Sequence, residues 1–252
     1  MVSLEAAAVL LVIAALLFFP ALWWAMRGGD FRGGNNLKSL GLALRSYALD
    51  HEGYAPPLSA RPGQLRFESD EIIPKYVSEP YLLMSHADPV VLEAGDANLS
   101  MPFCIEHCSY YYLGYEVWDD QTVQAFSAGY GKHLVEGLPF DSELPVDLAL
   151  GKLVRLSDSV DRETAPHAET NPPNWDGPRP RDSEIPWLIE RPHAYPGPFG
   201  LYLMGPVVPL SKSVLGGLVL YQDGHVEFIR YPGKWPMTEK TISTLEALAT
   251  GK

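Results

Sequence analysis

GLVLYQDGHVEFIRY, residues 217–231, is the stretch that decides how this chain folds. Two runs rich in β-branched and aromatic residues flank Asp223-Gly224, a pair typical of a two-residue type I′ hairpin turn. That loop predicts a register in which Tyr221 lies opposite Val226. Apolar residues then occur on both faces of the hairpin, so we expect it to lie within a covered antiparallel sheet.

A helix is predicted well before this hairpin, in NNLKSLGLALRSYALDHEGYAPP, residues 35–57. Asn35 or Asn36 can cap its start, it runs to about Glu52, and Gly53 ends it. Apolar residues recur at helical spacing and predict one buried face, made of Leu37, Leu40, Leu44, Tyr47 and Ala48. The expected fold class is therefore α+β, an amphipathic helix packed on an antiparallel β-sheet.

The residues between these two segments give weaker signals. Residues 109–118 (SYYYLGYEVW) read as a buried strand, and residues 68–92 as a short helix or turn followed by a loop. Residues 123–137 predict a helix interrupted by Gly129 and Gly131. Residues 147–156 suit a strand or a short helix equally well. The prolines of residues 165–200 predict a long irregular insertion.

The N-terminus carries an apolar run, AAAVLLVIAALLFFPALWWAM, that extends over residues 6–26 without a charge. At about 1.5 Å per residue this helix would span about 31 Å, close to the hydrocarbon thickness of a bilayer. Trp23 and Trp24 lie where an interfacial aromatic belt is expected, and Arg27 follows them. The length of the run, and the single acid with no basic residue before it, favour a retained anchor over a cleaved signal peptide.

The same N-terminus resembles a known family. Ser3-Leu4-Glu5 followed by the apolar run is similar to the mature N-terminus of type IV pilins and type II secretion pseudopilins. The resemblance implies that Glu5 faces the terminal amine of a neighbouring subunit during assembly, and that Pro20 bends the helix. The sequence departs from the family in two ways: no basic leader ending in Gly precedes residue 1, and Met1 stands where Phe is usual.

Two further blocks resemble a bacterial group of pilin-like proteins. Residues 35–57 are similar to the conserved helix that follows the membrane segment in that group, and DGHVEFIRYPGKWPMT, residues 223–238, to its C-terminus. The histidine that this group places before the Asp-Gly pair is Ser213 here. The implied organisation is an anchor helix over residues 1–27, a Gly-rich hinge over 28–34, and one extracytoplasmic domain over 35–252.

Composition and charge limit the classes of partner. The chain has 252 residues, 46% hydrophobic and 20% charged, as in a globular protein, and a net charge of −12. Residues 1–53 carry equal numbers of basic and acidic side chains, so the net charge lies in residues 54–252. An acidic domain without a basic cluster is a poor ligand for phosphates, so nucleic acid is not an expected partner.

Few residue patterns indicate chemistry. Asp223, His225 and Glu227 form a weak metal-site candidate, because a turn aspartate normally bonds its own backbone. Cys104 and Cys108, in CIEHC, lack the usual zinc spacing, and in an oxidising exterior they can form a small-loop disulfide or stay reduced. The pseudopilin resemblance allows Ca²⁺ in acidic loops, with Asp119, Asp120, Asp158 and Asp161 as candidates. No nucleophile motif or phosphate-binding loop occurs, so no enzyme and no cofactor are expected.

The sequence therefore predicts a membrane-anchored, pilin-like structural protein of the cytoplasmic (inner) membrane. The expected partners are the lipid bilayer and either further copies of the chain or other pilin-like subunits. The basic residues after residue 26 would place the body in the cytoplasm, whereas the family implies a periplasmic or extracellular body, which we adopt. The alternative function is an anchored extracytoplasmic module that binds a ligand such as a glycan through the insertion at 165–200.

Overall fold

The computed structural model describes residues 33–95, 98–146, 152–156, 180–195 and 214–251. The predicted anchor, most of the hinge, Glu5 and Pro20 lie outside the described residues, as does most of the Pro-rich insertion. Within the described part of the chain, no helix combines the length and apolar character needed to cross a membrane.

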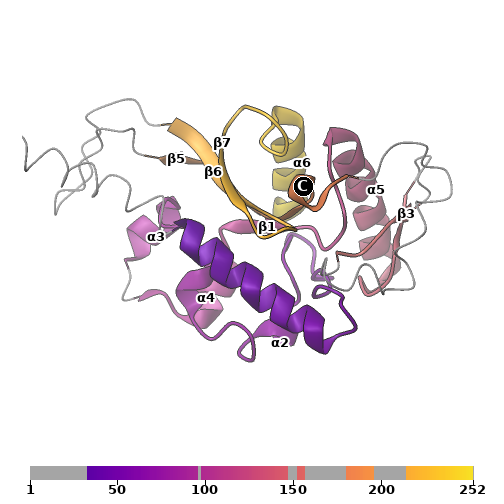
Figure 1. The fold of residues 1–252 in the computed structure, drawn as a ribbon, viewed down its shortest axis with the longest axis horizontal. Helices are drawn as coiled ribbons and strands as arrows, with labels where there is room; N and C mark the ends of the chain where they lie inside the picture. Colours follow the sequence, from indigo (N-terminus) through magenta and orange to yellow (C-terminus); the bar gives the residue numbers. More distant parts are fainter. Residues whose placement is uncertain (1–32, 96–97, 147–151, 157–179, 196–213, 252) are drawn as a thin grey trace, which may run out of the picture.

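An antiparallel five-stranded sheet organises the described residues (Figure 1). Its strands are β1 (Tyr110–Tyr112), β4 (Pro186–Glu190), β5 (His193–Tyr195), β6 (Val214–Tyr221) and β7 (Val226–Arg230). The long strand β6 pairs with β5 through its first residues and with β4 through its last, while β7 also pairs with β6. The structure is thus a mixture of helices and a curled antiparallel sheet, the α+β class expected from the sequence.

The predicted hairpin is present as β6 and β7. Its predicted turn type is wrong, and its predicted register is wrong by one residue. Val226 lies opposite Leu220 instead of Tyr221. The Gly224 N–H donates to the Tyr221 carbonyl (2.9 Å), and Gly224 has a φ of 88°. These features define a three-residue loop, a type I turn followed by a left-handed glycine, in place of the type I′ turn. Val226 therefore shares a sheet face with Leu220.

Residues 33–50 form the predicted amphipathic helix, which lies along one face of the sheet (Figure 1). Every residue expected on its inner face is buried: Leu37, Leu40, Leu44, Tyr47 and Ala48. A Cβ added at Gly41 would lie 2.8 Å from the Leu220 side chain, so this glycine lets the helix approach β6 closely. The predicted start is wrong, because residues 33 and 34 are already helical.

Polar contacts fix the same helix at both ends. The Asn36 amide donates to the Tyr81 carbonyl (3.3 Å) and does not cap its own helix. Near the other end, Arg45 donates to the Gln222 carbonyl in the hairpin loop (2.7 Å), and its guanidinium lies 5.9 Å from the centre of the Trp187 ring. The helix is thus held both by apolar packing and by hydrogen bonds to the segments around it.

Two further helices, α5 (Asp120–Glu136) and α6 (Glu239–Thr250), pack against each other on the other side of the sheet (Figure 1). A Cβ at Gly217 of β6 would lie 2.8 Å from Met237, just before α6, so this face is also covered. The predicted interruption of α5 by its glycines is wrong, because the helix is continuous. A Cβ added at Gly129 would lie 2.9 Å from the Pro145 carbonyl oxygen, so this glycine lets α5 approach that backbone closely.

Short elements complete the described fold. The region expected to form a short helix or turn contains α2 (Ser69–Ile72), η1 (Pro80–Leu83) and α3 (Pro89–Ala94). Helix α4 (Met101–Glu106) had no counterpart in the sequence prediction. Of the strand predicted over residues 109–118, only β1 pairs with a neighbouring strand of the sheet. Tyr115 forms an isolated bridge with Arg155. The remaining elements are β2 (Leu144–Pro145), β3 (Lys152–Leu153) and η4 (Asp182–Glu184).

Candidate functional site

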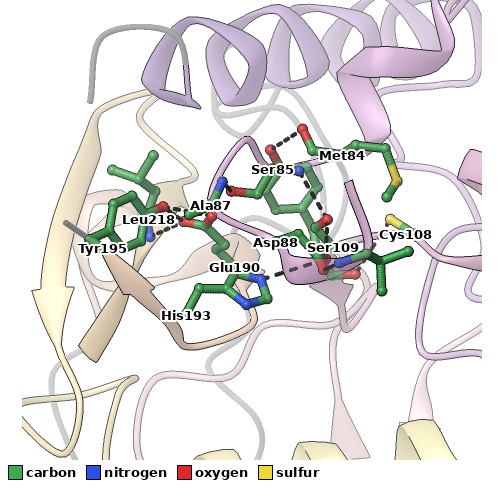
Figure 2. A network of polar contacts seen from close by, with 12 residues as sticks. Met84, Ser85, Ala87, Asp88, Cys108, Ser109, Glu190, His193, Tyr195 and Leu218 are labelled. Atoms are coloured by element: carbon green, nitrogen blue, oxygen red, sulfur yellow. Dashed lines mark hydrogen bonds and ion pairs between the residues drawn. The ribbon is translucent and has the colours of Figure 1, made fainter. Parts of the chain in front are cut away.

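A network of buried polar and ionisable side chains lies where the loop before α3 meets the sheet (Figure 2). We call this group the Glu190 network, and it comprises Ser85, Asp88, Ser109, Glu190, His193 and Tyr195. It draws residues from four parts of the chain: the loop 84–88, the start of β1, the end of β4, and strand β5.

Glu190, the last residue of β4, is completely shielded from solvent. The Tyr195 hydroxyl lies 2.6 Å from each of its carboxyl oxygens, and the Leu218 N–H of β6 donates to one of them (2.6 Å). Burial raises the pKa of Glu190 to about 7, and nearby Asp88 acts in the same direction, against the hydrogen bonds of Ser85, Tyr195 and Leu218. This carboxyl therefore titrates near neutrality.

Asp88 is the second buried acid of the network, with 5% of its surface exposed. Its Oδ1 accepts the Val90 N–H (3.0 Å) and so caps α3, while its Oδ2 accepts the Ser109 hydroxyl (2.6 Å). The Ser109 hydroxyl in turn accepts the Ser85 N–H (2.9 Å). This chain of bonds fastens the loop 84–88 to the start of β1.

His193 of β5 is the third ionisable group. Its Nε2 lies 3.6 Å from Asp88 Oδ2, too long for a hydrogen bond, and has no hydrogen-bond partner in the described structure. Burial lowers the pKa of His193, and Arg191 lowers it further, while Asp88 opposes both effects. The imidazole is thus held in its neutral form at neutral pH.

The network contains the residue types of a hydrolytic triad but not its connections. A serine nucleophile needs its hydroxyl bonded to a histidine base and open to substrate. Here the Ser109 hydroxyl donates to Asp88, and Ser109 is completely buried. This arrangement supports proton uptake and release within the domain and does not present a nucleophile.

The weak metal candidates are not assembled into a site. Asp223 Oδ1 accepts the His225 N–H (3.0 Å) and lies 2.5 Å from the His225 ring nitrogen, so it serves the turn, as aspartates in turns usually do. Glu227 pairs with Lys234 at 2.8 Å. Among the described residues, no group of three or more histidine, cysteine or acidic side chains could hold a metal ion.

The acidic calcium candidates in the described chain have helix-stabilising roles. Asp119 caps α5 by accepting the Thr122 N–H (2.7 Å). Asp120 accepts the hydroxyls of Thr238 and Thr241 at the start of α6. Asp158 and Asp161 lie outside the described residues.

The two cysteines are free, buried thiols in the structure. Cys104 lies in α4, and burial raises its pKa to about 11. Burial also raises the pKa of Cys108, whose thiol lies 3.6 Å from the Tyr110 carbonyl. A raised pKa suppresses the thiolate, so neither side chain has the character of a reactive cysteine.

The outward face of helix 33–50 carries two exposed leucines. Leu42 and Leu49 are each 66% exposed. They are seven residues apart, so they lie on the same side of the helix, two turns from each other. The helix therefore buries one apolar face in the domain and presents a second, smaller one to its surroundings.

The sequence did not identify the Glu190 network. Glu190 lies in PWLIE, where it shares a sheet face with Leu188, and an acid at such an alternate position is the one available signal.

Family models, curated proteins and solved structures were all compared with the chain, and none of them matches it.

Proposed function

We propose that this chain is a membrane-anchored, pilin-like structural protein that self-assembles, or forms a scaffold with other pilin-like subunits, in a secretion or surface apparatus. The apolar run 6–26 would hold it in the cytoplasmic membrane as a single-pass protein, with the domain over 35–252 periplasmic or extracellular. The resemblance of residues 3–17 and 35–57 to pilin-like proteins supports this proposal.

The observation that carries the proposal is the outward face of helix 33–50. This helix follows the apolar run after a short Gly-rich stretch, and it still exposes Leu42 and Leu49 after packing on the sheet. Exposed leucines two turns apart are a suitable contact for the same helix in a neighbouring subunit. Because subunits anchored in one membrane are confined to a plane, even a small apolar contact between their helices gains from high effective concentration.

The experiment compares chemical crosslinking of the full-length chain in membranes with that of the double variant Leu42→Glu/Leu49→Glu. Two carboxylates cannot be buried in an apolar helix contact without a large desolvation cost, so crosslinked dimers and larger species should fall several-fold. Both residues are exposed, so the fold itself should tolerate the change.

Val135→Glu is the matched control, because Val135 is an 89% exposed apolar residue on α5. It adds the same charge at a different surface and should leave the crosslinking pattern unchanged. Equal crosslinking in the wild type and the double variant would contradict assembly through this face. Loss of crosslinking in the Val135→Glu control as well would contradict it equally, because the effect would then be one of added charge.

A further inference from the structure

One buried carboxyl group lies between two separate segments of the described chain. Glu190 lies 2.6 Å from the Tyr195 hydroxyl of β5, and Ser85 of the loop 84–88 is near enough to its carboxyl group to lower the pKa of Glu190. His193 of β5 faces Asp88 of the same loop at 3.6 Å (Figure 2). The loop 84–88 and strand β5 therefore both border the same buried carboxyl group.

The groups that face Glu190 are neutral or acidic. They are Tyr195 from β5, Tyr110 from β1, and Ser85 and Asp88 from the loop before α3. Helix 33–50 contributes an uncharged amide, Asn36, which donates to the Met84 carbonyl (3.5 Å). Within the described residues, no basic side chain forms an ion pair with Glu190.

The two basic residues that follow Glu190 in the chain lie beside other partners. The Arg191 guanidinium lies 5.4 Å from the centre of the Tyr111 ring, and Tyr111 and Tyr110 are neighbours on a strand and so point to opposite faces. The His193 imidazole lies beside Asp88. A negative charge on Glu190 is thus shielded from water and placed near a second carboxyl without a compensating cation.

Ionisation of such a carboxyl favours any motion that lets water reach it. Tyr195 of β5 hydrogen-bonds to the carboxyl group, and the loop 84–88 with Ser85 and Asp88 lies next to it, so opening these segments would hydrate Glu190 and leave the rest of the sheet paired. We propose that the Glu190 network is a pH-dependent conformational switch, in which loss of the Glu190 proton favours local opening of the loop 84–88 and strand β5 from the sheet.

The direction and the pH window follow from linkage. Burial raises the pKa of Glu190 to about 7 from the value of 4.5 expected in the open, hydrated state. Between these values the open form loses its proton and the closed form keeps it, so opening becomes easier as the pH rises. The opening constant should increase on the order of a hundredfold across the window and level off above it.

Amide hydrogen exchange of the full chain in detergent, read by mass spectrometry from pH 5 to pH 8, tests the switch. Protection factors of wild type and Glu190→Gln are compared at each pH. The base catalysis of amide exchange itself and the opposite contribution of His193 are common to both proteins, so they cancel. For peptides covering 84–95 and 190–195, the opening constant of the wild type divided by that of Glu190→Gln should rise with pH on the order of a hundredfold. Peptides from α5 and α6 should show no such change.

The control is Glu93→Gln, an exposed acid on α3 that should exchange as the wild type does. Tyr195→Phe is a second, independent variant that keeps the ring and removes one donor to the ionised carboxyl. Its pH-dependent loss of protection should exceed that of the wild type and continue above pH 7. The switch is refuted if wild type, Glu190→Gln and Tyr195→Phe share one pH profile, or if α5 and α6 lose protection together with β5.

Discussion

Glu190 and His193 lie in one network but affect stability in opposite directions as the pH changes. Burial raises the pKa of the glutamate to about 7, so its stabilising effect is lost as the pH rises through 7. Burial lowers the pKa of the histidine below its ordinary 6.5, so the unfolded chain takes up that proton first, and stability is lost as the pH falls below 6.5. Two residues three positions apart in the chain thus oppose each other in the pH range in which both titrate.

Replacing His193 should reduce the loss of stability in acid. The unfolding free energy of the wild type should fall below pH 6.5 by up to about 1.4 kcal/mol per pH unit through this one proton. His193→Gln removes the titration, so relative to the wild type its free energy of unfolding should increase as the pH falls below 6.5, in urea titrations at pH 5 to 8. His193→Phe also lacks the proton and should show the same reduced slope, whatever its absolute stability. Parallel curves for all three proteins would contradict this role.

Sequence reasoning located the buried leucines of helix 33–50 but not the buried acids. Leu37, Leu40 and Leu44 repeat with the helical period, and that information is local. Glu190 and Asp88 are about a hundred residues apart, and what buries them is the meeting of a loop with two strands. An acidic side chain reads as exposed until its neighbours in space are known.

At the scale of elements, Asp120 links α5 to α6 at one end of their contact, and the Gln124 amide adds a hydrogen bond to the Thr244 hydroxyl (2.6 Å). Asp120 in the first turn of α5 accepts hydrogen bonds from Thr238 and Thr241, which cap and begin α6. Asp120→Ala leaves these two hydroxyls without that acceptor, and Thr241 is completely buried. The free energy of unfolding in denaturant titrations should therefore fall by about 1 to 2 kcal/mol.

Glu136→Ala is the control for this prediction, because Glu136 lies at the other end of the same helix and pairs only loosely with Lys132, at 4.0 Å. Its effect should stay within about 0.5 kcal/mol. An Asp120→Ala variant as stable as the Glu136→Ala variant would show that the two helices pack without this bond.

The hairpin shows which properties of an element could be predicted from the sequence. Its existence and position were correct, because β-rich runs around Asp-Gly are a local signal. Its register was wrong, because Asp-Gly fits both a type I′ turn and a type I turn followed by a left-handed glycine. The observed loop also stacks the Tyr221 ring on His225, with centres 4.3 Å apart, a contact that the pairing rule does not include.

The whole molecule is expected to be inserted in a membrane with its domain outside the cytoplasm. Protease added to intact spheroplasts should remove residues 54–252 and leave a short membrane-bound fragment. Detection of the domain uses an antibody to the C-terminus, and a cytoplasmic protein that stays intact is the control. Digestion only after lysis would reverse the proposed orientation, in agreement with the positive residues that follow the apolar run.

At this scale the α+β class followed from two well-marked segments, one helical and one hairpin. The arrangement of helices on both sides of the sheet did not, because α5 was expected to be broken and α6 was not anticipated. Gly129, which seemed to interrupt α5, instead marks where that helix meets the backbone of Pro145. Whether a glycine ends a helix or permits a close contact depends on what lies opposite it.

The attachment of helix 33–50 to the sheet has a mechanical consequence. If residue 33 is pulled along the helix axis, the load reaches β6 through the contact at Gly41 and Leu220, and the hairpin loop through Arg45. These attachments lie side by side along the helix, so they bear tension together in shear and are not peeled apart one after another. Force arriving from the N-terminus is therefore distributed into the central strand of the domain.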